Sequence, residues 1–201
     1  MAIKTANNNS MSAITALPSG VSAKSLILLS TQTASSSSTI SFTSGIDSTY
    51  DEYVFKYYNI HPSANYGNLQ FQASVNGGSS YGIAKTSTSF YAGHYEDDSN
   101  AEVVYLTSKD LAQGTGAQLL SNDPGNGNDE SCNGYLHLFA PSSTTFVKHF
   151  IARTLAYNGS DICIDGYFAG YVNSTSAVNA VQFSASSGNI DAGIIKMYGV
   201  L

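Results

Sequence analysis

Apolar and polar residues alternate most regularly in residues 68–75. The apolar positions of this stretch are every second residue: Leu69, Phe71, Ala73 and Val75. A side-chain period of two places such residues on one face of a β-strand and leaves the polar residues on the other face. Residues 51–60 are rich in aromatic side chains, as strands are, and turn-forming residues connect the two stretches at 61–67. The pattern predicts β-sheet.

Similar strand candidates recur along the chain from residue 38 onward. They are residues 38–43, 51–60, 68–75, 86–92, 102–107, 134–140, 145–157, 162–173, 177–185 and 192–201. Gly/Asn-rich turn signals lie between several of them, at 76–78, 123–127, 158–161 and 187–189. Only residues 108–120 could form a helix, a short one, and Gly114 and Gly116 oppose it.

Short strands separated by such turns predict an all-β fold, either a sandwich or a barrel. Eight to ten antiparallel strands fit a jelly-roll β-sandwich better than an immunoglobulin-like domain, which has fewer strands and, in antibodies, a central Trp. The chain contains no Trp. We therefore expect an antiparallel, jelly-roll-type sandwich over residues 37–201.

Residues 1–36 have a different composition and are expected to form an extended N-terminal arm. Residues 1–22 are rich in Asn, Ser and Ala, residues 24–31 are a possible strand, and residues 33–38 resemble a Ser/Thr linker. A segment of this composition cannot fold alone, so it is either disordered or ordered on a neighbouring subunit. Sparse apolar residues favour docking and are the expected anchors: Ile3, Met11, Ile14 and Leu17.

Charged residues make up only 11% of the chain, against about 25% in typical proteins. The net charge is −6 and no basic patch is visible, which argues against nucleic-acid binding. No stretch approaches the length of a membrane span, and no secretory signal is recognisable, so we expect synthesis in the cytoplasm. Cys132 and Cys163 lack metal-site spacing and are either two buried thiols or one bridge between neighbouring strands.

The sequence carries no recognisable catalytic motif, and we expect a protein that is not an enzyme. Strand alternation places His137 beside Tyr135 and Phe139, and it places His149 on a face with Ile151. Both histidines are expected to be structural. Acidic residues for glycoside hydrolysis are present, but nothing selects a pair of them.

Two groups of loop residues are candidate binding sites. The Asn/Asp/Gly-rich loop 122–130 has the oxygen ligands that Ca²⁺ prefers, near Asp123, Asn126, Asn128 and Asp129, although any exposed turn has a similar composition. Of the 14 tyrosines, several lie near predicted loops: Tyr66, Tyr81, Tyr91 and Tyr95. Loop tyrosines either stack on sugars or form subunit contacts.

Several stretches resemble small virion proteins of tailed bacteriophages, aquatic ones especially. They are residues 2–4, 7–10 and 12–18, then 41–56, 59–62 and 71–78, and finally 187–190 and 193–200. The resemblance implies a structural protein on the particle exterior, either a decoration protein of the head or a tail-fibre-like appendage. The implied partners are the major capsid protein or a tail component. We also expect self-assembly as a homotrimer, which would hide sheet edges, and the alternative function is binding of a host surface glycan.

Overall fold

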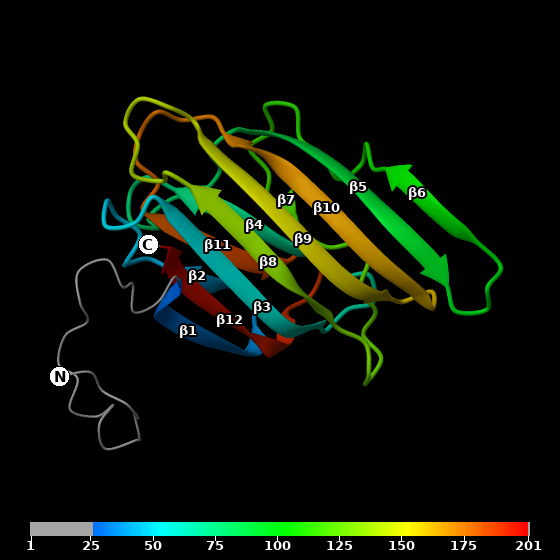
Figure 1. Cartoon of the computed structure of the whole chain (residues 1–201). Helices are drawn as coiled ribbons and strands as arrows, with labels where there is room; N and C mark the ends of the chain where they lie inside the picture. The colour runs from blue at the N-terminus through cyan, green and yellow to red at the C-terminus, as the bar shows by residue number, and fades with distance from the viewer. Residues whose placement is uncertain (1–25, 201) are drawn as a thin grey trace, which may run out of the picture.

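The computed structural model describes residues 26–200, which form twelve β-strands and no helix (Figure 1). The strands are β1 (Leu26–Ser37), β2 (Ile40–Phe42), β3 (Glu52–Pro62), β4 (Leu69–Ser74), β5 (Lys85–Tyr95), β6 (Ala101–Tyr105), β7 (Gln118–Leu119), β8 (Cys132–Phe139), β9 (Lys148–Asn158), β10 (Ile162–Val172), β11 (Ala180–Ala185) and β12 (Ile190–Val200). The described part of the chain therefore offers no helix that could span a lipid bilayer.

The strands form two antiparallel sheets. The eight-stranded sheet has the order β1-β12-β3-β8-β9-β10-β5-β6, and the four-stranded sheet has the order β2-β11-β4-β7. Strands far apart in sequence pair across the molecule: β1 with β12, β2 with β11, β3 with β8 and β4 with β7. Two local pairs, β5 with β6 and β9 with β10, extend the large sheet beyond β8.

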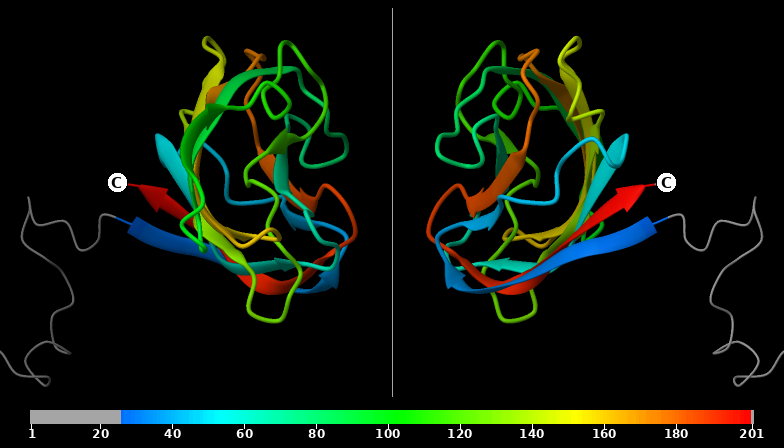
Figure 2. Two further views of the ribbon diagram at one scale, coloured as in Figure 1. Left: turned by 90° about the vertical axis from the view of Figure 1, so that its right-hand side faces the viewer. Right: turned by 90° about the vertical axis from the view of Figure 1, so that its left-hand side faces the viewer.

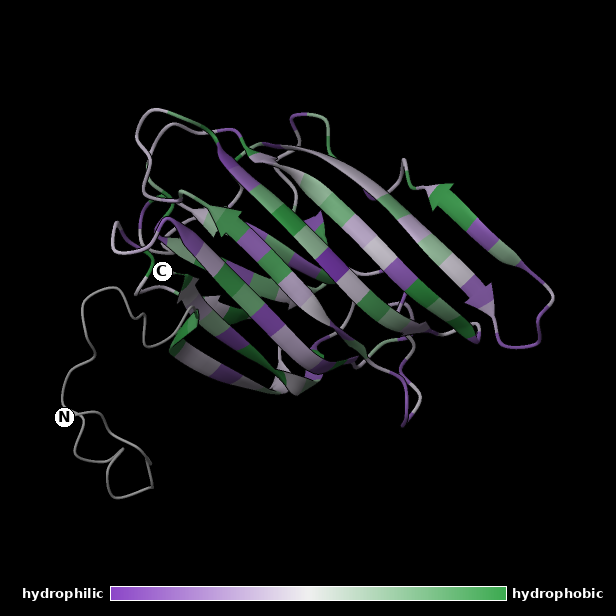
Figure 3. Cartoon of the chain, in the orientation of Figure 1, coloured by the Kyte–Doolittle hydropathy of each residue, from purple (hydrophilic) through white to green (hydrophobic). Residues whose placement is uncertain are grey.

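The two sheets share one hydrophobic core. Seen end on, they curve around a common interior (Figure 2). Aromatic rings connect the sheets: Phe55 of β3 lies 5.3 Å from Phe42 and 5.5 Å from Phe183, measured between ring centroids. Hydrophilic and hydrophobic residues alternate along many strands (Figure 3), and on strands such as β4 and β9 alternate side chains are buried in this core.

Most of the strands expected from the sequence are confirmed, and so is the all-β class. Leu69, Phe71 and Ala73 are buried on one face of β4, as their alternation predicts. The possible helix at residues 108–120 does not form; this segment contains turns, bends and the two-residue strand β7. Its two glycines and its pairing with β4 explain that outcome.

The first described residues correct the expected boundary of the N-terminal arm. Residues 33–37 are not a linker, because β1 continues through them and pairs with β12 as far as Ser37 opposite Ile190. The Ser/Thr-rich composition suits this edge strand, in which Ala34 is the one fully buried residue. The β domain therefore begins by residue 26. The proposed arm anchors lie outside the described residues: Ile3, Met11, Ile14 and Leu17.

The two cysteines are free thiols on opposite faces of the large sheet. Cys132 is buried and Cys163 is exposed. The expectation of two buried thiols is confirmed for Cys132 and wrong for Cys163, and the alternative bridge does not form. The register explains this: Cys132 pairs with Ala156, which faces inward, and Cys163 pairs with the next residue, Tyr157, which faces the other side.

Candidate functional site

The side of the large sheet that points away from the small sheet, here called the outer face, carries many exposed apolar side chains. In Figure 1 the small sheet lies behind the large one. The exposed apolar residues of the outer face come from five strands: Leu28, Tyr58, Phe90, Val103, Tyr105, Ile151 and Leu155. Their exposed fractions run from 40% for Tyr58 to 76% for Val103. Exposed apolar side chains mark an interaction surface where they lie next to one another, as Phe90 and Tyr105 do in the β5–β6 pair.

An ion pair on two neighbouring strands lies in the middle of the outer face. Arg153 of β9 donates from Nε to Asp165 Oδ1 at 2.8 Å and from Nη2 to Asp165 Oδ2 at 2.6 Å. The guanidinium also lies 5.1 Å from the ring centroid of Tyr167, whose other neighbour is the stacked ring of Phe90 at 4.8 Å. Hydrogen bonds from Arg153 lower the pKa of the Asp165 carboxyl. This bidentate contact fixes the aromatic rings around it.

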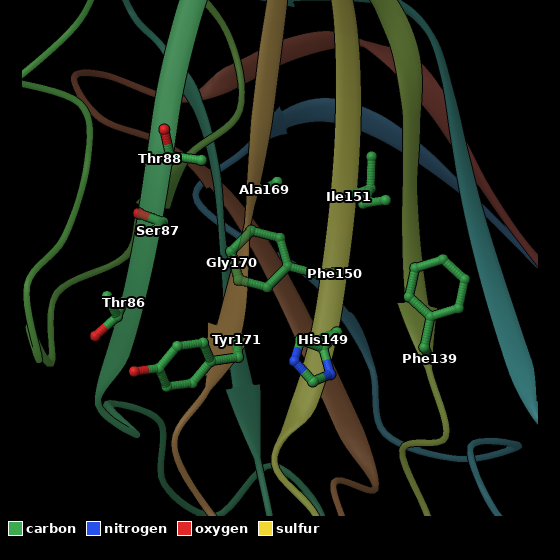
Figure 4. Close-up of a pocket in the computed structure, with 10 residues that line it drawn as sticks. All are labelled: Thr86, Ser87, Thr88, Phe139, His149, Phe150, Ile151, Ala169, Gly170 and Tyr171. Carbon is green, nitrogen blue, oxygen red and sulfur yellow. The ribbon is translucent and has the colours of Figure 1, made fainter.

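A shallow groove of about 420 Å³ lies on the outer face at the start of β9 and the end of β10 (Figure 4). Small residues at Ala169 and Gly170 form its floor, and larger side chains from β8, β9 and β10 surround them, including Phe139, His149 and Tyr171. The lining is mostly apolar. The groove can therefore accept an apolar side chain from another molecule.

Both strand histidines lie on the outer face, as expected from the alternation. His137 lies between Tyr135 and Phe139, with ring centroids 5.0 Å and 6.1 Å away, and its Nδ1 contacts a Glu52 carboxylate oxygen. His149 lies 6.2 Å from the Tyr171 ring. These contacts are cross-strand packing and agree with a structural role.

A second site, here called the polar pocket, lies between the inner side of β10 and the loops before β4 and after β7. Its volume is about 250 Å³. The polar residues that line it come from five segments: Tyr66, Tyr91, Lys109, Asn122 with Asp123, and Asn158 with Ser160. Ile162 and Ile164 of β10 form its apolar wall.

Lys109 and Asp123 form an ion pair in the polar pocket. The Lys109 side chain is 8% exposed, and its ammonium donates to Asp123 Oδ1 at 2.8 Å and to Asn68 Oδ1 at 3.1 Å. Asn68 in turn donates from Nδ2 to Asp123 Oδ1 at 2.7 Å. Burial lowers the pKa of Lys109, and the Asp123 carboxylate opposes that effect. The network holds both charges in place at the pocket wall.

Asn122 differs from its neighbours because its side chain has no partner. The residue is 2% exposed, and neither its amide nitrogen nor its amide oxygen makes a hydrogen bond within the described structure. Its main-chain carbonyl is held by Asn158 Nδ2 at 3.4 Å. Both amide atoms are closed to solvent, and a buried amide without partners is costly in a folded protein.

The structure brings together two of the four tyrosines singled out from the sequence. Tyr66 and Tyr91 line the polar pocket, and Tyr95 lines an adjacent cavity with Glu96, Asp97 and Asp161. Tyr66 is held by its hydroxyl, 3.0 Å from Ser160 Oγ. Tyr81 belongs to another part of the molecule and buries its hydroxyl next to Gly78.

The four residues named as possible Ca²⁺ ligands have different surroundings in the structure. Asp123 accepts from Lys109 and Asn68, Asn126 donates to the Ser63 carbonyl at 3.3 Å, and Asn128 and Asp129 line a separate surface depression. Among residues 26–200, no three His, Cys, Asp or Glu side chains are grouped as metal ligands would be.

Sequence reasoning missed Lys109, which lies in the segment for which a helix was considered. It included Asn122 only as the first residue of the candidate Ca²⁺ loop 122–130 and gave it no role of its own. The one available signal was the composition of residues 121–124, where uncharged and acidic polar residues precede a proline. No protein-family model matches the chain, and no curated protein is detectably similar to it.

Proposed function

We propose that this chain is a non-enzymatic structural protein on the exterior of a bacteriophage particle, and within that class a decoration protein of the capsid. The observation that carries the proposal is the outer face, with seven large apolar side chains that are at least 40% exposed. A surface of this kind suits a protein that works within an assembly. The sequence resemblance to phage virion proteins agrees with that placement.

We further propose that the fold is a β-sandwich of the jelly-roll type, with two added hairpins. In a jelly roll the first strand pairs with the last, the second with the next to last, and so on inward. Once β5, β6, β9 and β10 are set aside, the remaining strands have this pairing: β1 with β12, β2 with β11, β3 with β8 and β4 with β7. Jelly rolls are frequent among viral capsid and lectin domains.

The proposed occupant of the outer face is another copy of this chain, in a closed homotrimer. The face contains both a raised apolar set, around Ile151 and Leu155, and the apolar groove beside Ala169 and Tyr171. Closed assembly would also cover the edge strands β1 and β6, whose outward main-chain groups are otherwise open to pairing. The trimer would then contact the major capsid protein through surfaces other than the outer face. We propose residues 1–25 as the segment that docks on the capsid.

A second candidate function is a receptor- or glycan-binding appendage of the tail. The polar pocket favours it, because Tyr66 and Tyr91 converge there with amide and hydroxyl groups. Either location gives a protein that is made in the host cytoplasm and ends on the outside of the virion.

Immunogold labelling of intact phage particles, with antibody against this protein, tests the proposal. Label distributed over the head is the expected result, and label at the tail tip would favour the appendage. Absence of label on every particle would refute the virion assignment. Particles assembled with a chain that lacks residues 1–25 test docking. We expect these particles to lose the label, while the circular dichroism spectrum of the purified truncated chain still shows the β fold. Retained label would contradict an anchoring role for residues 1–25.

A further inference from the structure

Lys109 and Asn68 bring an amine and a carboxamide into direct contact inside the fold. The Lys109 side chain is 8% exposed, and Asn68 is 6% exposed. Lys109 Nζ lies 3.1 Å from the side-chain oxygen of Asn68, although the two residues are 41 positions apart along the chain. Two groups that a fold holds this close need no further loss of translational freedom in order to react with each other.

Asp123 lies beside both groups. Its Oδ1 accepts one hydrogen bond from Lys109 Nζ at 2.8 Å and another from Asn68 Nδ2 at 2.7 Å. A single carboxylate oxygen therefore touches both the amine that could attack the carboxamide and the nitrogen that would leave it. Such a carboxylate can take a proton from the amine as a general base and deliver it to the leaving nitrogen as a general acid.

The carboxamide oxygen of Asn68 is held by further donors. The main-chain nitrogen of Asp123 donates to Asn68 Oδ1 at 2.7 Å, and Ser121 Oγ donates to it at 3.4 Å. Donors at a carbonyl oxygen stabilise the negative charge that this oxygen gains when a nucleophile adds to the carbon atom. A nucleophile, a proton carrier and an oxyanion site thus surround one carboxamide.

The surroundings of Lys109 favour its neutral form, which is the nucleophilic one. Burial lowers the pKa of Lys109, although the Asp123 carboxylate opposes that effect. Two other lysines are buried in the described part of the chain, Lys85 and Lys148, and their ammonium groups donate to main-chain carbonyl oxygens. The contact with a carboxamide and a carboxylate sets Lys109 apart from both.

We propose that Lys109 and Asn68 become joined by an intramolecular isopeptide bond, with Asp123 as the catalytic residue. Asp123 takes one proton from the Lys109 ammonium, and the neutral Nζ adds to Asn68 Cγ. Asp123 then passes its proton to Nδ2, the bond between Cγ and Nδ2 breaks, and ammonia leaves. A second Nζ proton moves through Asp123 to the ammonia, which departs as ammonium and leaves Asp123 as a carboxylate. One amide replaces another, so the reaction needs no oxidant or reductant.

The product can leave the site, because the Asp123 side chain is 43% exposed. Escape of the ammonium into solvent makes the reaction irreversible. The ion pair of Lys109 with Asp123 is then the state of the chain before the reaction. The bond would connect the residue that precedes β4 to the segment between β6 and β7. The inference does not depend on the virion proposal, since the bond forms within one chain wherever that chain is found.

Intact-mass spectrometry of the denatured full chain tests the bond. The purified protein should be lighter than its sequence mass by about 17 Da, which is the ammonia released. Trypsin does not cleave after an acylated lysine, so digestion should yield residues 57–85 joined to residues 86–148 in one branched peptide. The full sequence mass, with residues 57–85 and 86–109 released as separate peptides, would overturn the inference.

Variants distinguish the bond from other losses of ammonia. Lys109→Arg keeps a cation beside Asp123 but lacks the attacking amine, so this variant should have its full sequence mass. Lys85→Met is the matched control, because it removes another buried lysine and should still show the mass loss. A mass loss that persists in Lys109→Arg would refute the bond and point to a succinimide at an Asn-Gly sequence such as Asn126-Gly127.

Asp123→Asn tests the catalytic role, because an amide cannot carry the proton. This variant should remain unlinked at full mass, and a linked Asp123→Asn chain would refute that role. Circular dichroism checks that each variant retains the β fold. If Lys109→Arg fails to fold, Asn68→Ala takes its place, since it removes the carboxamide carbon and should also have its full mass.

Discussion

Phe71 of β4 and Phe150 of β9 meet edge to face, with ring centroids 5.0 Å apart, at the contact between the two sheets. Each is 1% exposed. Replacing Phe71 with Ala removes this contact and leaves a cavity, so the free energy of unfolding should fall by about 3–5 kcal/mol. Urea denaturation measures the change. Phe146→Ala is the control, because Phe146 is 72% exposed; a loss for Phe71→Ala no larger than for the control would contradict this packing.

Lys85 makes stability depend on pH. Its side chain is fully buried, its ammonium donates to the Ile83 carbonyl at 2.9 Å, and burial lowers its pKa from 10.5 to about 8. Between these two values the unfolded chain holds a proton that the folded chain has released. Stability should therefore rise with pH across this window, by at most about 1.4 kcal/mol per pH unit from this group.

Urea denaturation of the wild type and of Lys85→Met at pH 7, 8 and 9 checks that expectation. The variant lacks the buried ammonium, so it should be more stable at pH 7 and show a smaller slope. Burial also lowers the pKa of Lys109 and Lys148, which adds a slope of the same sign in both proteins. Equal slopes for wild type and variant would show that Lys85 does not titrate in this range.

The two thiols should differ sharply in reactivity. Cys163 is exposed on β10, whereas Cys132 is buried in β8, and burial raises its thiol pKa to about 12. Since the thiolate is the reactive form, Ellman's reagent should modify one thiol in the native protein and two after denaturation. Cys163→Ser should leave no rapidly reacting thiol. Fast modification of that variant would mean that β8 opens readily.

The outer face should govern self-association. Replacing Ile151 and Leu155 together with Ser removes two side chains that are 50% and 53% exposed. Polar replacements at an apolar contact should weaken assembly by about tenfold or more, while an exposed position costs the monomer little stability. Light scattering coupled to size-exclusion chromatography measures the assembly, and thermal unfolding monitors the fold.

Phe146→Ser is the matched control for this double variant, because Phe146 is exposed in the loop before β9. It should assemble like the wild type. A wild-type chain that remains monomeric at high concentration would refute the homotrimer, and an unaltered trimer in the double variant would move the contact to another surface.

Local alternation was sufficient to predict most strands, because buried and exposed positions of β4 and β9 differ in side-chain polarity. It failed for residues 33–37 of β1, whose Ser residues lie on an edge strand and show no alternation of apolar and polar side chains. It also failed for β7, since two residues are too short for any period. Strand order was beyond reach, because pairs such as β1 and β12 depend on contacts across the whole chain.

The polar pocket, too, could be predicted from the sequence only in part. Tyr66 and Tyr91 were candidates because aromatic residues near loops suggest binding. Their convergence with Asn122 depends on how the loop before β4, strand β5 and the segment after β7 meet. The absent partner of Asn122 is a property of the folded surroundings. No pattern in the sequence encodes it.

Leu26 lies directly opposite Val200 in the β1–β12 pair, and the pairing continues to Ser37 opposite Ile190. The ladder bonds of antiparallel strands run perpendicular to the strands. A force that pulls residues 26 and 200 apart would therefore load those bonds one after another, as in opening a zipper, and would never load them all in shear. A tether joining both ends of the β domain to separate anchors would peel β1 away while the remainder of the sheet stays intact.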